Sequence, residues 1–419
     1  MNTYDIVIIG GGAAGLSAAL GAYEPSLSIL IIEKDQSLGG ILNQCIHSGF
    51  GLHVFNETLT GPEYAQRYID RVHETSISYL LETTVLDIQK SKSFVIKASN
   101  LKDGLLTITS TAVIITTGCY ERPMGALQMN GTRPKGIMTA GRAQKYLNMD
   151  GYHVGKNIFI LGSGDIGLIM ARRLTLEGAN VLGVAEMLPY SNGLTRNIVQ
   201  CLDDFDIPLY LSHTITDISG KKVLEFVTIS ELDVYYQPIP GTEKTFKVDT
   251  LLLSVGLIPD VNMFDSLQFE KSLTTKSAIV DQNHMSSVSG LFFCGNALHV
   301  HDLVDWVSIE SHEAGTHAKS FVQSQKHVQR DYLNISFNEN IRYVIPQRLD
   351  KQNINETTFY LRSTKKMLKA KLNIFQNNQL IASKQLRYVA PAEMEKMTIN
   401  PQIIQDDHDI HMTLEEVTT

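Results

Sequence analysis

The feature that most constrains this chain is a glycine-rich turn that occurs twice between an apolar strand and a helix. In the first copy, the apolar run Asp5–Ile9 leads into a G-x-G-x-x-G pattern, and a second apolar run ends at Glu33, 23 residues after the first glycine. The three glycines are Gly10, Gly12 and Gly15. In such a unit the glycines permit a tight turn, close approach of a pyrophosphate and close helix packing, and the acid accepts hydrogen bonds from a ribose diol. The segment therefore predicts a dinucleotide-binding unit.

The same pattern returns after residue 156, with an apolar run at 157–161 and an acid, Glu186, 24 residues after the first glycine. No Lys or Arg lies between Glu186 and Gly193. A 2′-phosphate would meet a carboxylate with no cation beside it, so NAD(H) is favoured over NADP(H). Two alternatives stay open, namely another adenine nucleotide or a lost ligand. The predicted contact residues are Gly162, Gly164, Asp165, Gly167 and Glu186.

Strand patterns between and after the two units predict the rest of the fold. Runs at 93–98 and 105–109 flank an Asp103-Gly104 turn, and buried strands at 112–117 and 250–255 each end in glycine. We expect an α/β protein with two Rossmann-like three-layer domains, antiparallel β inserts and a small β-rich C-terminal domain. Its strands are expected at 342–345, 358–362, 369–375 and 379–387, with a frayed tail from Gln402. The predicted domains are 1–120 and 257–330 for one nucleotide fold, 121–256 for the other, and 331–419 for docking or as a lid.

Composition excludes several classes of protein. The chain has 36 Lys and Arg against 44 Asp and Glu, a net charge of −8, which argues against a broad surface for nucleic acid. Four cysteines in 419 residues rule out a disulfide scaffold. The first residues lack a basic signal-peptide region, and the apolar stretch 6–20 is interrupted by glycines. We expect a cytoplasmic protein that is not integral to a membrane.

Six segments in order resemble the pyridine nucleotide–disulfide oxidoreductase superfamily. Besides the two fingerprints, they are residues 38–40, 116–118 with Arg122-Pro123, 255–256 and 290–296. The resemblance implies FAD in the first fold, NAD(H) in the second, and a return of the chain to FAD at Gly295-Asn296. Further cofactor-binding residues expected on this ground are Lys34, Gly40, Gln44, Thr117, Gly118, Gly256, Gly295, Asn296 and Asp302.

Two departures from the superfamily pattern narrow the function. Only one cysteine, Cys45, follows the Gly39-Gly40 pair, and there is no C-x-x-C, so dithiol–disulfide exchange within the chain is not expected. Asn296 stands where an Asp is usual, and its amide could still accept a ribityl hydrogen bond through the carbonyl oxygen. Segments 44–47, 59–64 and 299–305 resemble FAD subunits of opine oxidase, hydrogen cyanide synthase, dye-linked proline dehydrogenase and glycerol-3-phosphate dehydrogenase systems.

The candidate catalytic residues are Cys45, His47, His299 and His301. Cys45 could cycle as a redox thiolate whose pKa His47 lowers, or it could be a buried small hydrophobe. His299 and His301 could line a flavin pocket and relay a proton. No metal site is expected, because closed-zinc spacing is absent. Asp302 and Asp305 are predicted as N-cap and N3 of the following helix, whose positive end would face the flavin.

These features predict an FAD-dependent oxidoreductase that transfers electrons between NAD(H) and a partner redox centre or small acceptor. The resemblance implies one subunit of a glycerol-3-phosphate or amine dehydrogenase system. Its partner would be a second dehydrogenase subunit, and homo- or hetero-oligomers are possible. The alternatives are a stand-alone single-Cys NADH oxidase or peroxidase, and a non-catalytic flavoprotein subunit that holds an adenine nucleotide.

Overall fold

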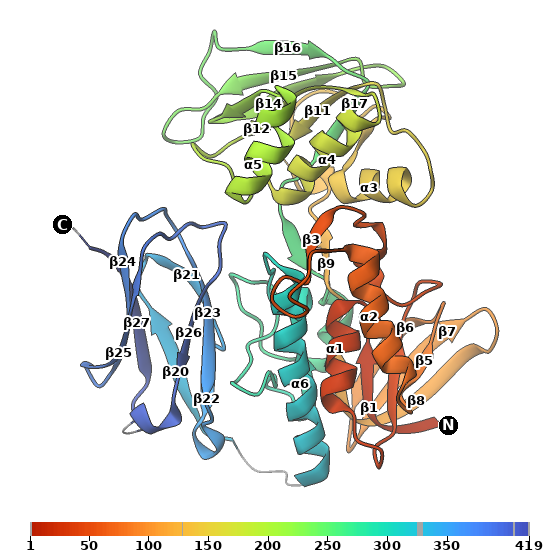
Figure 1. Ribbon diagram of the computed structural model, residues 1–419, viewed down its shortest axis with the longest axis vertical. Helices are drawn as coiled ribbons and strands as arrows, with labels where there is room; N and C mark the ends of the chain where they lie inside the picture. Colours follow the sequence, from red (N-terminus) through yellow and green to blue (C-terminus); the bar gives the residue numbers. More distant parts are fainter. Residues whose placement is uncertain (1, 128, 325–329, 405–406, 418–419) are drawn as a thin grey trace. The chain divides into compact units, whose positions relative to one another are not determined.

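A computed structural model describes residues 2–127, 129–324, 330–404 and 407–417 (Figure 1). The chain divides into two compact units, one made of Met1–Cys119 with Pro259–Thr419 and the other of Tyr120–Ile258. The first unit contains the first fingerprint and the C-terminal β structure, and the second unit contains the second fingerprint. Each unit is described by itself below.

The first unit is built on a sheet in the order β5-β2-β1-β8-β7-β6, with β19 also paired to β8. β1 pairs in parallel with β2 and β8, as a strand–helix–strand crossover requires. The central strands are rich in Ile and Val and are buried on both faces, which is typical of a parallel sheet covered on both sides. The bounds are β1 (Asn2–Ile9), β2 (Ile29–Ile32), β5 (Ser78–Leu80), β6 (Thr84–Lys90), β7 (Phe94–Asn100), β8 (Gly104–Ile115) and β19 (Leu291–Phe293). A small ribbon pairs β3 (Ser48–Phe50) with β4 (Leu59–Thr60).

Strand β8 differs from the sequence expectation. The hairpin at Asp103-Gly104 is confirmed, since Asn100 pairs with Gly104. The expected separate strands at 105–109 and 112–117 are one continuous strand of 12 residues. Its first half pairs antiparallel with β7, and its second half pairs in parallel with β19. Ser110 and Thr111, between the two halves, both stay in the extended conformation. The antiparallel insert and the parallel sheet therefore share one strand.

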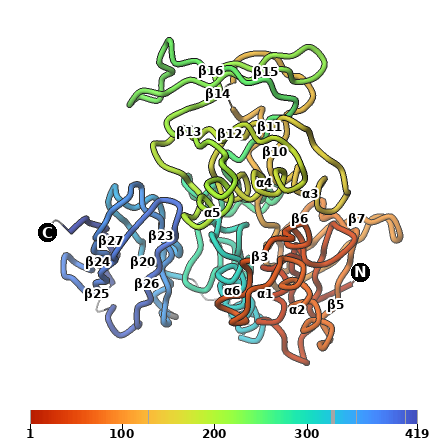
Figure 2. The backbone as a smooth tube through the Cα atoms, turned by 45° about the horizontal axis from the view of Figure 1, so that its top comes forward, coloured from red at the N-terminus to blue at the C-terminus, as the bar shows by residue number. Residues whose placement is uncertain are grey.

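Two helices lie side by side over one face of this sheet, α1 (Ala13–Ala22) and α6 (Val304–Ser324) (Figures 1 and 2). Their contact requires glycine on both helices. A Cβ at Gly21 would lie 2.1 Å from the His312 carbonyl oxygen, and one at Gly315 would lie 2.0 Å from that of Ala18. The third helix, α2 (Gly61–His73), starts with a capping box between Thr60 and Glu63.

The second unit repeats the architecture with a five-stranded parallel sheet in the order β10-β17-β11-β12-β13. A separate antiparallel sheet has the order β14-β15-β16, and β9 pairs with β18. The strands are β9 (Cys119–Glu121), β10 (Ile137–Thr139), β11 (Asn157–Leu161), β12 (Asn180–Glu186), β13 (Leu209–Leu211), β14 (His213–Ser219), β15 (Phe226–Glu231), β16 (Lys244–Lys247), β17 (Thr250–Leu253) and β18 (Leu257–Pro259). The helices are α3 (Ala140–Asn148), α4 (Asp165–Leu176) and α5 (Thr195–Cys201).

The C-terminal part of the first unit is a β-sandwich of a five-stranded sheet, β22-β20-β27-β24-β25, and a three-stranded sheet, β21-β23-β26. Its own core includes Leu333, Phe359, Leu361, Leu372 and Met412. The predicted turn at Asn377-Asn378 is confirmed, with both residues at positive φ. The strands are β20 (Tyr332–Phe337), β21 (Ile341–Ile345), β22 (Arg348–Asp350), β23 (Thr357–Ser363), β24 (Ala370–Gln376), β25 (Gln379–Leu386), β26 (Glu395–Ile399) and β27 (Ile410–Glu416).

The expectation of a frayed tail from Gln402 is wrong. Strand β27 lies inside the five-stranded sheet, between β20 and β24. Ile410, Met412 and Leu414 alternate with polar residues and are fully buried. This period of two is a strand pattern that the high content of Asp, Glu and His in the tail obscured.

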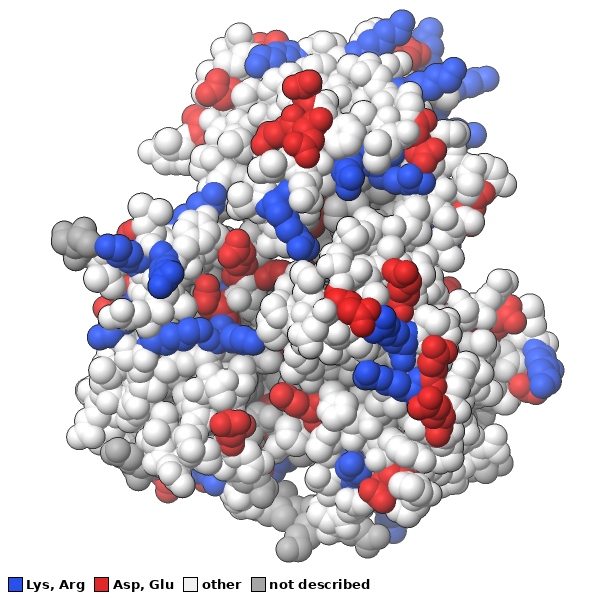
Figure 3. All heavy atoms as spheres, viewed as in Figure 1, with Lys and Arg blue, Asp and Glu red and all other residues white. Residues whose placement is uncertain are grey.

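Acidic and basic side chains are interspersed on the face of the molecule shown in Figure 3. This agrees with the small acidic excess of the sequence. Among the described helices, none combines the length and the apolar character needed to cross a membrane.

Candidate functional site

The first fingerprint forms a turn with room for a ligand over its second glycine. Gly10 has φ of 111°, and a Cβ there would lie 2.6 Å from the Thr116 carbonyl oxygen. A Cβ on Gly15 would lie only 1.8 Å from the Gly10 carbonyl oxygen. Around Gly12, by contrast, the nearest atom to such a Cβ is the Gly40 Cα at 3.9 Å. Glycine is therefore required at the turn and at the helix contact, and the backbone at Gly12 stays open to a bound group.

Glu33 follows β2 directly and is held against this turn. Its carboxylate accepts hydrogen bonds from the Gly11 N–H at 2.6 Å and from the Asp35 N–H at 2.8 Å, and the residue is 4% exposed. A carboxylate has about four acceptor positions, so two remain for a ribose diol. Lys34 beside it is exposed.

Glycine backbone also forms the neighbouring edges of this site. Gly39 lies in the left-handed region and bridges to Gly12, and Gly40 has φ of 54°. Gly118 has φ of 73°, and a Cβ there would meet no atom within 4 Å. The Thr117 hydroxyl instead donates to the Asp260 carbonyl oxygen at 2.6 Å. Gln44 is buried at the end of the turn that follows Gly40.

The chain returns to this edge of the sheet after β19, at Gly295 and Asn296. The Asn296 Oδ1 accepts from the His301 N–H at 3.0 Å, and its Nδ2 lies 3.7 Å from the Cys119 sulfur. Because a backbone N–H can only donate, the carbonyl end of this amide is turned toward His301. This oxygen has a second lone pair, so a hydrogen bond from a ribityl chain to it stays a prediction. Cys119 thus lies beside this amide.

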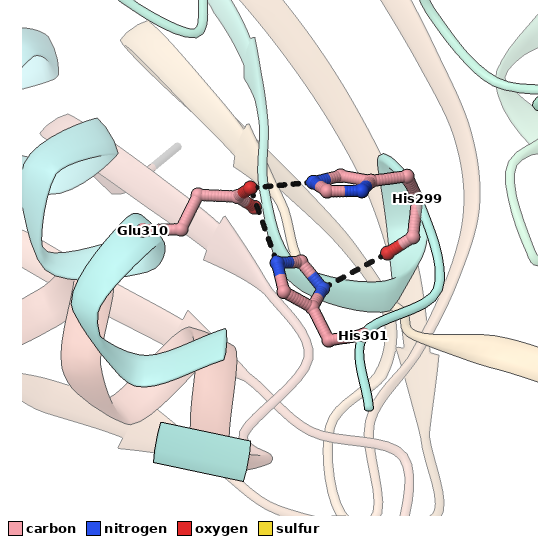
Figure 4. A group of neighbouring side chains, drawn as sticks. All are labelled: His299, His301 and Glu310. Atoms are coloured by element: carbon pink, nitrogen blue, oxygen red, sulfur yellow. Dashed lines mark hydrogen bonds and ion pairs between the residues drawn. The ribbon is translucent and has the colours of Figure 1, made fainter. Parts of the chain in front are cut away.

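The buried carboxylate of Glu310 contacts both candidate histidines, His299 and His301 (Figure 4). The Glu310 Oε2 lies 2.7 Å from the His299 Nε2 and 3.2 Å from the His301 Nε2. The Glu310 Oε1 accepts from the Gly295 N–H at 2.7 Å. All three side chains are almost completely buried. Glu310 therefore ties the two imidazoles to the turn at Gly295.

The hydrogen-bond partners of each ring nitrogen limit where protons can lie in this cluster. The His301 Nδ1 faces two acceptors, the His299 carbonyl oxygen at 3.0 Å and the Asn296 Oδ1 at 3.3 Å, while its Nε2 faces Glu310. The Nδ1 must carry hydrogen to donate to the His299 carbonyl oxygen, and the contact between the Nε2 and Glu310 needs one more hydrogen, on either the imidazole or the carboxyl group. Burial would raise the pKa of Glu310, but the two imidazoles outweigh it and hold that pKa well below its usual value. Burial and the charge of His301 lower the pKa of His299 to about 4, so His299 is neutral.

Stability should therefore fall as the pH drops from 6.5 toward 4. The unfolded chain binds a proton at His299 below pH 6.5, whereas the folded chain keeps this imidazole neutral down to about pH 4. Between pH 7 and pH 5 this single group should remove about 2 kcal/mol of unfolding free energy. Urea unfolding at both pH values measures the loss, with His299→Gln as comparison. An equal pH dependence in the two proteins would show that His299 titrates normally.

The same three residues could hold a metal ion, since their ligand atoms lie within 4.8 Å of one another. The sequence pattern predicted no metal site and gave no signal for Glu310. A metal-bound imidazole nearly always donates its second N–H to an acceptor. The His299 Nδ1 is buried with no hydrogen-bond partner among the described residues. The arrangement therefore favours a hydrogen-bonded charge cluster over a metal centre.

Asp302 was predicted as the N-cap of the next helix, and this is wrong. Helix α6 begins at Val304, so Leu303 precedes it. The Asp302 carboxylate forms an ion pair with Arg362 and accepts from the Met394 N–H, both in the sandwich. Asp305 lies in the first turn of α6, where it accepts from the Gly51 and Val54 N–H groups at 3.2 Å. The positions of both carboxylates are therefore set by partners that are distant in the sequence, and not by the end of the helix.

Cys45 and His47 each lie close to a backbone carbonyl oxygen. Burial raises the pKa of Cys45 to about 12, and its sulfur lies 3.3 Å from the Ile41 carbonyl oxygen. The His47 Nδ1 contacts the Ser48 carbonyl oxygen at 3.0 Å. The thiol is therefore protonated at neutral pH, and a redox role for it stays a prediction.

The second fingerprint has the same construction in the other unit. Gly162 has φ of 95°, and Glu186 accepts from the Ser163 N–H at 3.0 Å and its hydroxyl at 2.7 Å. Asp165 was expected to contact a cofactor, but its Oδ1 accepts from the Leu194 N–H and the Asn197 amide. Gly164 and Gly167 lie beside Ser254, whose hydroxyl accepts from the Gly167 N–H, and Gly256 has φ of 105°.

A profile of the pyridine nucleotide-disulphide oxidoreductase family matches residues 4–318. The chain belongs to this family. The family consists of oxidoreductases that use a pyridine nucleotide, and membership implies binding of FAD and a nicotinamide nucleotide. The glycine turn at Gly10–Gly15, the open backbone at Gly12 and Gly118, and the fixed Glu33 carboxylate fit an FAD molecule in the first unit.

Two proteins and one solved structure show what the chain is similar to. It is 25% identical over 322 residues to the alpha subunit of sarcosine oxidase from Corynebacterium sp. (strain U-96), covering 70% of this chain and 31% of that protein. It is 20% identical to the A subunit of opine oxidase from Agrobacterium tumefaciens (strain Ach5), covering 70% and 61%. The chain thus spans less than two thirds of either relative. The crystal structure of T. acidophilum thioredoxin reductase superposes with a TM-score of 0.64 at 24% identity, over 78% of this chain and all of that one, which shows the shared fold.

Proposed function

We propose that this oxidoreductase transfers electrons between NAD(H) and a partner redox centre or small acceptor, as a subunit of a glycerol-3-phosphate or amine dehydrogenase system. The observation that carries the proposal is the pair of glycine turns, each with a buried glutamate at the end of the second strand. Sequence similarity to subunits of sarcosine oxidase and opine oxidase supports the multi-subunit part.

The chain's own residues would bind and orient FAD, which when bound supplies the hydride- and electron-accepting chemistry. The open backbone at Gly12 and the start of α1 would face the pyrophosphate, while Gly10 and Gly15 permit the turn and the close helix contact. Glu33 would accept from the adenosine ribose. Asn296 and the turn at Gly295 would form the edge of the site nearest the Glu310 cluster, where His301 donates from its Nδ1 to the His299 carbonyl oxygen.

Dithiol chemistry is not part of the proposal. The four cysteines are not joined in disulfides, and two of them, Cys201 and Cys294, are buried. The protonated state of Cys45 argues against a thiolate that attacks a disulfide at neutral pH. We infer that the flavin, rather than a cysteine pair, passes electrons to the acceptor.

NADH should reduce the bound flavin at least tenfold faster than NADPH. The 2′-phosphate of NADPH would approach the Glu186 carboxylate, with no Lys or Arg in residues 187–193 to neutralise it. An unmatched phosphate costs on the order of 1.4 kcal/mol or more, which is a factor of ten. Anaerobic stopped-flow mixing, followed by flavin absorbance, measures the two rates.

Two variants sharpen this experiment. Glu186→Gln should lower the ratio of the NADH rate to the NADPH rate. Glu225→Gln, at an exposed residue of the same unit, should leave this ratio unchanged. Equal rates with the two nucleotides in the unmodified protein would contradict the assignment of NAD(H). Absence of reduction by either one would leave the second fold without a nicotinamide role.

A further inference from the structure

A polar cavity of about 240 Å³ lies between α6, the loop at 281–284 and the sandwich. Its charged lining consists of three carboxylates, Asp281, Glu313 and Glu356, and no Lys or Arg lines it among the described residues. Tyr360 separates it from the Glu310 cluster, with its ring centroid 5.9 Å from that of His299. None of these residues belongs to the fingerprints or to the proposed electron-transfer site.

Two imidazoles in the same wall each have an unsatisfied nitrogen. His284 and His317 both line the cavity, with ring centroids 5.9 Å apart. The Nδ1 atom of each is buried without a hydrogen-bond partner among the described residues. His284 is only 7% exposed. Desolvation lowers the pKa of both residues, to about 4 for His317, so they are neutral and each ring offers one lone pair.

The negative charges of the lining carboxylates are only partly balanced by neighbouring cations. Asp281 has Arg330 at 3.3 Å and two backbone N–H donors. Desolvation and the charges of Glu310 and Glu356 raise the pKa of Glu313 to about 7, and both Glu313 and Glu356 are exposed at the mouth of the cavity. The cation that acts on Glu313 is Lys396, whose ammonium lies over the Trp306 ring at 3.6 Å from its centroid. Glu313 and Glu356 therefore face each other without a cation in the cavity.

We propose that this cavity binds a small organic cation, an aliphatic amine whose ammonium group lies between Glu313 and Glu356, beside the neutral imidazole rings. An ammonium is a donor-only cation and matches a lining of carboxylates without a basic side chain. The volume equals that of about eight liquid waters, which suits a molecule of several carbons rather than a single ion. Among the described residues, the three ligand atoms needed for a metal converge only at His299, His301 and Glu310, outside this cavity.

Three probes of equal length test the proposal by isothermal titration calorimetry on the full chain with its flavin at pH 8. Putrescine carries ammonium ends, 1,4-butanediol carries hydroxyl ends and succinate carries carboxylate ends on the same four-carbon span. We expect one putrescine per chain and no saturable heat from the other two. Glu313→Gln should weaken putrescine at least tenfold, while Glu415→Gln, an exposed carboxylate of the sandwich, should leave binding unchanged.

Other outcomes would overturn the proposal. Equal binding of butanediol would show a site that recognises shape alone. Saturable binding of Zn²⁺ that His317→Ala abolishes, with no putrescine binding, would identify a metal site instead. The absence of saturable heat from every probe would show that the cavity is not a binding site for an amine. Flavin content and melting temperature of each variant establish that it is folded, and NADH reduction measured in parallel tests the proposed function separately.

Discussion

Gly15→Ala is expected to produce protein that is destabilised and poor in flavin. The added Cβ would lie 1.8 Å from the Gly10 carbonyl oxygen, a backbone atom of the turn itself, so α1 must move away from β1. Overpacking of this kind costs about 3 kcal/mol, against the gain of less than about 1 kcal/mol that alanine normally brings to a helix. The displaced turn also loses the position of its N–H groups. The ratio of flavin to protein absorbance and the melting temperature measure both effects.

Gly125→Ala is the matched control for this substitution. Its Cβ would meet no atom within 4 Å, and Gly125 has no positive φ. We expect it to keep the melting temperature and the flavin ratio of the unmodified protein. If Gly15→Ala behaved in the same way, the close contact between helix and turn would not exist in solution.

Glu310→Gln should be the most destabilising single-charge change. It preserves the shape of the side chain but removes the carboxylate charge that His299 and His301 both contact in a fully buried site. Breaking a buried ion pair by removing one partner costs about 3–5 kcal/mol. In a unit of this size we expect the melting temperature to fall by roughly 10 °C. Glu74→Gln, an exposed carboxylate after α2, should change it little.

A second measurement tests the protonation of this cluster. Two-dimensional NMR of imidazole-labelled protein should report a neutral His299 ring from pH 7 down to pH 5, because burial and the neighbouring imidazole lower its pKa to about 4. A His299 ring that takes up a proton near pH 6.5 would contradict this assignment.

Features whose determinants lie close together in the chain could be predicted from sequence. The spacing of Gly10, Gly12, Gly15 and Glu33 defines strand, turn, helix and strand within about thirty residues, and the structure has these elements. The Asp103-Gly104 hairpin and the Asn377-Asn378 turn follow from local backbone preferences in the same way. Family membership followed from the order of these local segments.

Features that depend on distant partners could not be predicted in this way. Glu310 meets His299 and His301 only because α6 packs back against the turn at Gly295. Asp302 resembled a helix cap in sequence, yet its partner Arg362 lies 60 residues away in the sandwich. Strand β27 was obscured by its charged residues. A period of two at Ile410, Met412 and Leu414 was the signal that could have found it.

The central claim is that the amino-terminal unit binds FAD over the turn at Gly10–Gly15. Titration of the flavin-free, folded chain with FAD, followed by quenching of flavin fluorescence, tests it most directly. The account predicts saturation at one FAD per chain, retained in Gly125→Ala and lost in Gly15→Ala. A chain that melts cooperatively yet shows no saturable quenching would contradict it.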